Sequence, residues 1–266
     1  MLKALTIAGF DGSGGAGIQA DLKTFSALGC YGMSVLTALP VQNTQGVISC
    51  YEIELKAIEE QLNAIFDDII PDAIKIGMLF NSDIIKLVAN FLYKNAKNIP
   101  IIVDPVMVAK SGDRLLLSSA VESLKEYILP IARVVTPNIP EACDLVGVKS
   151  INTDDDMLKV ASTILDMGAY SVILKGGHLD SNIARDLFLS KETKEFIDAK
   201  KIDTKNTHGT GCTLSAAICS YIARGYSELE ACKLAKEYLF NALLAAKSNS
   251  VGKGAGPVHH FYSIWD

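Results

Sequence analysis

A glycine-rich segment near the C-terminal end carries residue types suited to binding an anion. Residues 206–212 read Asn-Thr-His-Gly-Thr-Gly-Cys and run directly into an apolar stretch. At a helix start, successive backbone N–H groups converge on one point, with the positive end of the helix dipole behind them. Gly209, Thr210 and Gly211 are therefore predicted to cradle a phosphoryl group, and the helix start should lower the pKa of the Cys212 thiol. The alternative is a simple helix cap beside a buried cysteine.

Another glycine-rich segment, residues 9–17, is the first along the chain and lies between a predicted strand and a predicted helix. Its glycines at 12, 14 and 17 match the G-x-G-x-x-G pattern of dinucleotide-binding folds, which also needs an acidic residue about 20 positions later. No Asp or Glu occurs from Leu22 to Tyr51, and no G-x-x-x-x-G-K-[ST] pattern occurs anywhere, so both nucleotide-binding motifs are excluded. A tight turn without a ligand is the alternative. Because ligands bind at the carboxyl ends of strands in open α/β sheets, we predict that this loop contacts a small molecule.

Polar residues follow three further predicted strands. Asp104, the Asn138–Glu141 pair and Lys175 each come directly after a short buried run. Parallel strands would bring all of them to one edge of the sheet. Carboxylates, an amide and a lysine at one edge suit Mg²⁺ and a nucleoside triphosphate, with Asp104 and Glu141 as metal ligands. For Asn138 and Glu141 a helix-capping role is an equal alternative.

The elements that must position these residues alternate along the chain. Short β-branched runs predict strands at 4–8, 32–41, 47–53, 73–76, 101–103, 134–135 and 171–174. Longer amphipathic stretches predict helices at 18–28, 55–68, 83–94, 119–129, 139–146, 154–167, 213–224 and 227–246. Such alternation is typical of an α/β fold with a parallel sheet flanked by helices, and residues 184–199 add a hairpin. No linker or repeat interrupts residues 1–266, which predicts a single domain.

Composition narrows the function classes. The 266 residues are 49% hydrophobic and 21% charged, which excludes a disordered or disulfide-stapled chain. A net charge of −5 without a basic run argues against binding nucleic acid. No signal peptide, membrane span or C-x-x-C pair is apparent, so we expect a cytoplasmic protein with reduced thiols. His259 and His260 lack a partner at metal-ligand spacing, and packing or surface roles are favoured over zinc.

Taken together, the motifs resemble one family. Residues 6–47, with their Ser-Gly-Gly-Ala-Gly-Ile-Gln-Ala-Asp and Ala-Leu-Pro-Val-Gln-Asn-Thr runs, are similar to the hydroxymethylpyrimidine/phosphomethylpyrimidine kinases of thiamine biosynthesis. The resemblance continues at residues 75–78, 104–113, 136–138, 175–178, 206–212 and 251–260. It spans essentially the whole chain. Cys212 stands where the wider ribokinase-like superfamily has an Asp base, which is a feature of the pyrimidine kinases.

This resemblance implies a fold, a reaction and roles for particular residues. The fold would be a ribokinase-like three-layer α/β/α sandwich. The reaction would be Mg²⁺- and ATP-dependent phosphorylation of 4-amino-5-hydroxymethyl-2-methylpyrimidine and then of its monophosphate, by a cytoplasmic homodimer. The residues implied are Gln42, Gly9, Ala16, Asp21, Met78 and Val106 for the pyrimidine; Asn138, Glu141, Lys175 and Thr207 for ATP; and Lys175, Gly209, Thr210, Gly211 and Cys212 for the transfer.

Two departures and two alternatives accompany the resemblance. Phe10 and Gly12 replace a small polar residue and a proline of the family loop, which changes the stiffness of that loop. A pyridoxal or pyridoxine kinase is the nearest alternative function, because some relatives accept vitamin B6 compounds. A catalytically silent pyrimidine sensor is the alternative from another class, but a sensor has no need for Lys175, Glu141 and Cys212 together.

Overall fold

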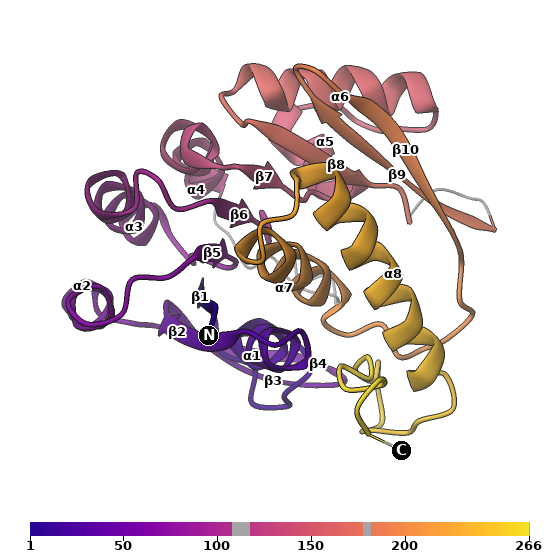
Figure 1. Ribbon diagram of the computed structural model, residues 1–266, viewed down its shortest axis with the longest axis horizontal. Coiled ribbons are helices and arrows are strands. Elements are labelled where there is room, and N and C mark those ends of the chain that lie inside the picture. The colour runs from indigo at the N-terminus through magenta and orange to yellow at the C-terminus, as the bar shows by residue number, and fades with distance from the viewer. Residues whose placement is uncertain (108–117, 178–181, 266) are drawn as a thin grey trace.

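A mostly parallel sheet forms the centre of the molecule. The computed structural model describes residues 1–107, 118–177 and 182–265, which form an eight-stranded main sheet and a separate two-stranded ribbon (Figure 1). The main sheet runs in the order β10 (Lys194–Lys200), β9 (Ile183–Ser190), β8 (Ser171–Lys175), β7 (Val134–Val135), β6 (Ile101–Val103), β5 (Ala73–Ile76), β1 (Lys3–Ala8) and β2 (Tyr31–Leu36). All neighbouring pairs from β8 to β2 are parallel, whereas β9 and β10 are antiparallel additions. The predicted parallel sheet and hairpin are both confirmed.

Helices cover both faces of this sheet. The helices are α1 (Gly17–Ala27), α2 (Leu55–Phe66), α3 (Ser82–Asn95), α4 (Ser118–Ser123), α5 (Ile139–Val146), α6 (Asp154–Asp166), α7 (Thr210–Ala223) and α8 (Glu228–Ala246). Helices α2 to α6 pack into one hydrophobic cluster, and α1, α7 and α8 into another on the opposite face. In β6, Ile101 and Val103 join the first cluster and Ile102 joins the second, which explains why this strand is apolar throughout. The expected three-layer α/β/α sandwich is confirmed.

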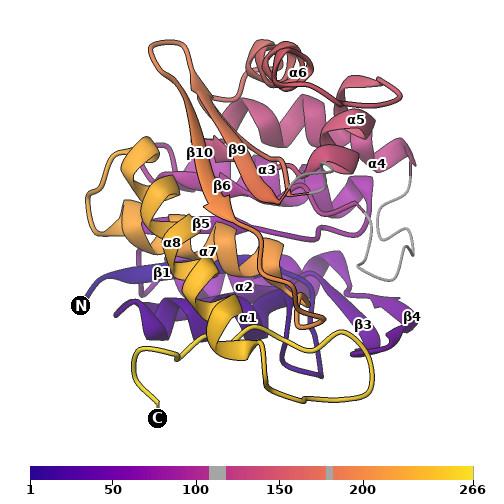
Figure 2. The ribbon, with the colours of Figure 1, turned by 90° about the vertical axis from the view of Figure 1, so that its right-hand side faces the viewer.

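The predicted strand at 32–41 is wrong as one element. It consists of β2 and β3 (Ala38–Asn43), and β3 pairs with β4 (Gly46–Glu52) in a ribbon that projects from the body of the molecule (Figure 2). Thr37 separates the two strands. Its backbone N–H donates to the Ala8 carbonyl, and its hydroxyl donates to the Met78 carbonyl at 2.6 Å. These bonds fix the chain at the edge of the main sheet and direct β3 away from it.

Other boundaries differ less. The helix predicted at 119–129 is α4 followed by a π-turn over Leu124–Ile128 and a 3₁₀ turn over Leu129–Ile131, where Pro130 has no N–H to continue an α-helix. Helix α7 begins at Thr210, three residues before the predicted start at Thr213. The motif residues 108–113 and His178 lie outside the described residues. Among the residues that are described, no helix has both the length and the apolar character required to cross a membrane.

The C-terminal segment is held against α7 and α8. His260 is buried, and its Nε2 lies 3.1 Å from the Thr213 hydroxyl. The Tyr238 hydroxyl donates to the His260 carbonyl at 2.6 Å. Burial, together with the charges of Lys23 and His259, lowers the pKa of His260 to about 4. His260 therefore packs as a neutral side chain, in agreement with the packed role expected for it.

This lowered pKa predicts a pH dependence of stability. In the unfolded chain His260 takes up its proton near pH 6.5, whereas in the folded chain it does so only near pH 4. Between these values the unfolded state binds more protons than the folded state. The stability contributed by neutral His260 is therefore fully present above pH 6.5 and is lost as the pH decreases toward 4. We therefore expect the free energy of unfolding, measured with urea across this pH range, to fall by about 1–3 kcal/mol more in the wild type than in His260→Gln. Parallel losses in the two proteins would contradict the prediction.

Candidate active site

A cavity of about 690 Å³ opens at the carboxyl ends of the parallel strands. Both glycine-rich segments and the polar residues after β6, β7 and β8 border it. The structure thus brings together nearly all the residues singled out from the sequence. Those along the wall are Gly9, Ala16, Gln42, Met78, Asp104, Val106, Asn138, Glu141, Lys175, Thr207, Gly209, Thr210, Gly211 and Cys212.

One end of the cavity combines apolar walls with an amide. Gln42 projects from β3, and its Nε2 donates to the Phe10 carbonyl at a long 3.4 Å. Phe10 and Met78 also line this end, and a Cβ at Gly9 would lie only 3.2 Å from the Met78 sulfur. A weakly bonded amide above apolar side chains suits a small heteroaromatic ring with a polar edge.

A charged cluster lies farther along the same cavity. Lys175 at the end of β8 places its Nζ 3.2 Å from Asp104 Oδ1 and 3.9 Å from Glu141 Oε2. The Thr136 hydroxyl donates to the same Asp104 oxygen at 3.1 Å. Burial disfavours the ammonium, but Asp104 and Glu141 outweigh it and raise the pKa of Lys175. Lys175 is therefore a fixed positive charge at the sheet edge.

The Asn138–Glu141 pair serves the helix as well as the cavity. The Asn138 side chain accepts from the Glu141 N–H at 2.9 Å, and the Glu141 carboxylate accepts from the Asn138 N–H at 2.8 Å. This is a complete capping box at the start of α5. Burial and the Asp104 charge raise the pKa of Glu141 to about 7, against the opposing effect of Lys175. The capping alternative is confirmed, and it fixes Glu141 beside Lys175.

The second glycine-rich segment packs against the first. Gly209, the residue before α7, has φ +77°, and a Cβ there would lie 1.8 Å from the Gly15 carbonyl oxygen. A Cβ at Gly211 would lie 3.3 Å from Asp104 Oδ2 and 3.5 Å from Lys175 Nζ. The start of α7 is thus in contact with the first loop on one side and with the charged cluster on the other. This arrangement can hold a phosphoryl group between backbone amides and an ammonium.

The expectation of a lowered pKa for Cys212 is wrong. Burial raises the pKa of this thiol to about 12, and the carboxylates of Asp21 and Asp104 add to the rise. Lys75 and a hydrogen bond from the Gly17 amide act in the opposite direction but are weaker. The helix start alone does not decide the pKa, because removal from water outweighs it. Cys212 is a neutral thiol in this structure.

Asp21 lies behind the cavity and not along its wall. Its carboxylate is fully buried, accepts from the Thr6 hydroxyl at 2.6 Å and lies 2.8 Å from Lys75 Nζ. Lys75 does border the cavity. Burial disfavours the Lys75 ammonium, but the adjacent Asp21 outweighs it and raises the lysine pKa. The geometry gives Asp21 contact with Lys75 in place of the direct substrate contact implied by the resemblance.

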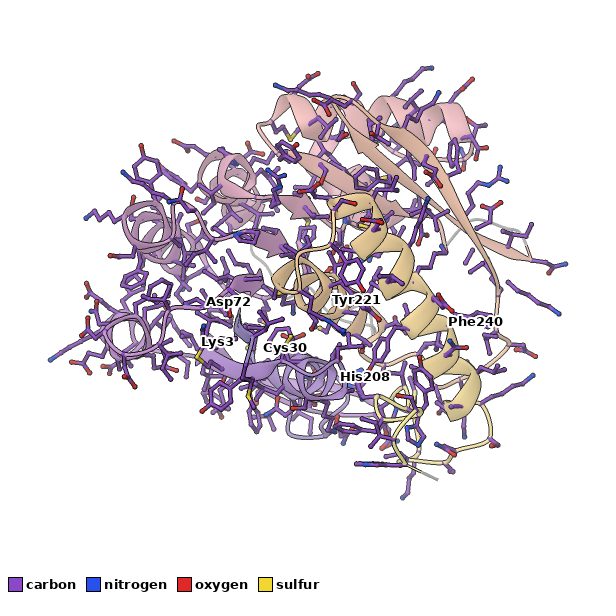
Figure 3. All side chains as sticks on the ribbon, in the orientation of Figure 1. Lys3, Cys30, Asp72, His208, Tyr221 and Phe240 are labelled. Atoms are coloured by element: carbon purple, nitrogen blue, oxygen red, sulfur yellow. The ribbon has the colours of Figure 1, made fainter. Side chains whose placement is uncertain are left out.

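Several cavity residues were not singled out from the sequence. Lys75 lies inside the buried strand β5, and a lysine within a short apolar run is a signal that could have found it. Ile202, Leu239, Phe240 and Leu243 make an apolar end formed by the chain after β10 and by α8, where Figure 3 labels Phe240. Leu239, Phe240 and Leu243 have the spacing of ordinary core residues on α8, so the sequence carries no signal for a site there. This apolar end suits the base of a nucleotide.

The oxygen ligands present fit Mg²⁺. Among the described residues, no group of three His, Cys, Asp or Glu side chains surrounds a common point. Mg²⁺ bound to nucleotides usually takes only one or two carboxylates, and phosphate oxygens and water complete the octahedron. Asp104 and Glu141 both approach Lys175, so two carboxylates converge beside Gly211 at the start of α7.

Comparisons with known proteins agree with this geometry. The family model described as phosphomethylpyrimidine kinase matches residues 11–259. The hydroxymethylpyrimidine/phosphomethylpyrimidine kinases of Escherichia coli K12 and Salmonella typhimurium are each 48% identical to this chain over 99% of both proteins. Among solved structures, phosphomethylpyrimidine kinase from Clostridium difficile 630 has 46% identity and a TM-score of 0.81, covering 91% of this chain and 100% of that one. An ADP complex of Bacillus subtilis pyridoxal kinase has 39% identity and a TM-score of 0.91, covering 100% of both chains.

The buried Asp21–Lys75 pair gives a stability prediction. Asp21→Asn leaves the buried Lys75 ammonium without a counter-charge and should lower the free energy of unfolding by about 3–5 kcal/mol. Asp21→Leu combined with Lys75→Met removes both charges and should cost clearly less than the single change, because no unpaired charge remains. Urea unfolding of the three proteins checks this. A double variant at least as unstable as Asp21→Asn would contradict the pairing.

Proposed function

This chain belongs to the phosphomethylpyrimidine kinase family, and from that membership and the cavity we propose its reaction. The protein transfers the γ-phosphoryl group of ATP to 4-amino-5-hydroxymethyl-2-methylpyrimidine and then to the resulting monophosphate. The observation that carries the proposal is the continuity of one cavity. An amide-bearing apolar end, a phosphoryl cradle and a charged cluster lie along it in that order.

The phosphoryl group would cross the middle of the cavity. In phosphoryl transfer, negative charge spreads over the transferred oxygens, and catalysis depends on positioning and on fixed positive charge. The amides of Gly209, Thr210 and Gly211 and the ammonium of Lys175 supply such donors. Asp104 and Glu141 would hold Mg²⁺, which when bound neutralises and orients the phosphate oxygens. Asn138 and Thr207, which also border the cavity, would contact the nucleotide phosphates.

The acceptor would occupy the end formed by the first glycine-rich loop and β3. Gln42 offers a donor and an acceptor in one side chain, which matches the edge of an aminopyrimidine. Gly9, Ala16, Met78 and Val106 would form the walls around the ring. Asp21 would act through Lys75, by keeping that ammonium charged and fixed beside the hydroxymethyl group.

A coupled ADP-release assay tests the reaction directly. Hydroxymethylpyrimidine, its monophosphate and pyridoxal are supplied separately with Mg²⁺-ATP. The proposal expects turnover of both pyrimidines with a higher kcat/KM than for pyridoxal. Absence of ADP release with either pyrimidine would contradict the proposal and would favour the sensor alternative.

Pyridoxal phosphorylation is a second candidate function, supported by the comparisons. The pyridoxal kinases of Bacillus subtilis and Staphylococcus aureus have TM-scores of 0.90 to 0.91 with this chain, higher than that of the Clostridium difficile phosphomethylpyrimidine kinase. Sequence identity ranks them the other way, at 37–39% against 46%. Because the identity of side chains decides which ring is bound, we place the pyrimidine first.

A homodimer is also proposed, following the family resemblance. The β3–β4 ribbon exposes large apolar side chains, among them Ile48 at 75% and Tyr51 at 59% exposure. Pairing of two ribbons would cover these side chains and would hold Gln42 on β3 in a fixed position.

The Gln42 assignment predicts a selective loss of acceptor recognition. Gln42→Leu keeps the bulk of the side chain but leaves the polar edge of the ring unpaired, at a cost of about 1–3 kcal/mol. This corresponds to a fall of about 5- to 150-fold in kcat/KM for hydroxymethylpyrimidine, with the KM for ATP nearly unchanged. Steady-state kinetics with each substrate varied in turn provides the measurement. An unchanged kcat/KM would place Gln42 outside the acceptor site.

The raised thiol pKa predicts how the two reactions respond to Cys212→Ala. A thiol with a pKa of about 12 is protonated at neutral pH and is a wall of the acceptor site, not a resting base. In the first step the acceptor is a neutral alcohol, and in the second it is a phosphate that is already ionised. A loose transition state needs little early removal of the alcohol proton, so the first step does not depend on a base more than the second. Both kcat values should therefore fall by similar factors, within about threefold of each other. A loss confined to the alcohol would instead identify Cys212 as a general base.

A further inference from the structure

The carboxylate of Asp11 organises the first glycine-rich loop. It is completely buried. Its Oδ1 accepts from the Ser13 N–H and hydroxyl at 2.9 and 2.7 Å, and its Oδ2 accepts from the N–H groups of Gly15 and Ala16 at 3.1 and 2.7 Å. These four bonds all remain within the loop. They would be enough to shape it without any other partner.

A fifth contact leaves the loop. Oδ2 of Asp11 lies 2.8 Å from Nε2 of His208, which is 197 residues away in the sequence. Burial opposes ionisation of Asp11, but the bonds from His208, Ser13 and the Ala16 amide outweigh it and lower its pKa to about 2. An ionised carboxylate can only accept, so Nε2 of the imidazole carries the proton that joins them. The pair is a directed hydrogen bond between two distant segments.

His208 is the residue immediately before the phosphoryl cradle. The backbone N–H of His208 donates to the Gly256 carbonyl at 3.0 Å, which ties this residue to the C-terminal segment. Figure 3 labels His208 between that segment and α1. A Cβ at Gly15 would lie 2.4 Å from its ring, and a Cβ at Gly209 would lie 1.8 Å from the Gly15 carbonyl. The two loops are therefore in direct contact at Gly15, in addition to the Asp11–His208 bond.

We infer that Asp11 and His208 are positioning residues that set the distance between the acceptor and the phosphoryl cradle. The inference rests on the proposed function, because it uses the acceptor end and the cradle assigned there. Asp11 holds Ala16, which borders the acceptor end, and His208 precedes Gly209, where the cradle begins. One hydrogen bond thus joins the parts of the site that must meet during transfer.

This role has a kinetic signature that a purely structural role lacks. Each substrate is held by its own end of the cavity, so loss of the bond should leave both affinities nearly unchanged. The distance between the reacting atoms would change, and a misplacement of about 1 Å can cost on the order of 100-fold in rate. Loss of the Asp11–His208 bond should therefore lower kcat and leave the dissociation constants of both substrates nearly unchanged.

Two amide substitutions at His208 make a matched test. In His208→Gln the side-chain nitrogen is separated from Cα by the same number of bonds as Nε2 and can reach Asp11. In His208→Asn the amide is similar but one carbon shorter, so it falls short of the carboxylate. We expect kcat of His208→Gln to stay within about fivefold of the wild type, and kcat of His208→Asn to fall about 100-fold. Dissociation constants for hydroxymethylpyrimidine and for ADP, from titration calorimetry, should change less than about threefold in both.

Ser13→Ala is the control. It removes the hydroxyl that donates to Asp11 Oδ1 and lies 3.5 Å from His208 Nε2, but it leaves the Asp11–His208 bond in place, so kcat should change by less than about threefold. Equal kcat losses in His208→Gln and His208→Asn would overturn the inference. A loss of affinity large enough to explain the fall in rate would also overturn it. If His208→Asn lost its thermal unfolding transition while His208→Gln kept it, the pair would be assigned to folding, against the inference. The comparison uses whichever acceptor the wild type phosphorylates, so failure of the pyrimidine assay and failure of this inference are distinguishable.

Discussion

Charge can be buried at the carboxyl edge of this sheet only because each charged group has a partner. An unpaired ion in a protein interior costs several kcal/mol, whereas a paired one is tolerated when its hydrogen bonds are satisfied. Lys175 lies between Asp104 and Glu141, and Lys75 lies against Asp21. These pairs keep two ammonium groups beside one cavity. The requirement for partners thus fixes which residues must meet at this edge, and the proposed phosphoryl transfer would use the charges that result.

The rest of the architecture serves this arrangement. Six parallel strands bring residues from β1, β5, β6, β7 and β8 to the same edge, and helices on both faces exclude water from the pairs behind it. Glycines at 15 and 209 let the two glycine-rich loops approach each other at distances that no Cβ would allow. Close packing of the loops and ion pairs holds the dipoles and charges around the cavity in fixed positions, and fixed dipoles and charges are the ones that accelerate a transfer reaction most.

Local patterns in the sequence predicted what depends on neighbouring residues. Buried β-branched runs identified the parallel strands, and α5 was predicted with its observed bounds because Asn138 and Glu141 form its cap. What the sequence could not provide depends on distant contacts. Thr37 ends β2 through bonds to Ala8 and Met78, and nothing in the continuous β pattern around it signals a break. The pKa of Cys212 follows its burial beside Asp21 and Asp104, which only the folded chain brings near it.

The most direct test of the central claim is the turnover of Lys175→Met. This change removes the positive charge between Asp104 and Glu141 while keeping a side chain of similar length. If this buried ammonium stabilises the transferred phosphoryl group, kcat for hydroxymethylpyrimidine should fall by about 100- to 1000-fold in a protein that keeps its fold by circular dichroism and still binds ADP. A folded variant with near-normal kcat would contradict the account.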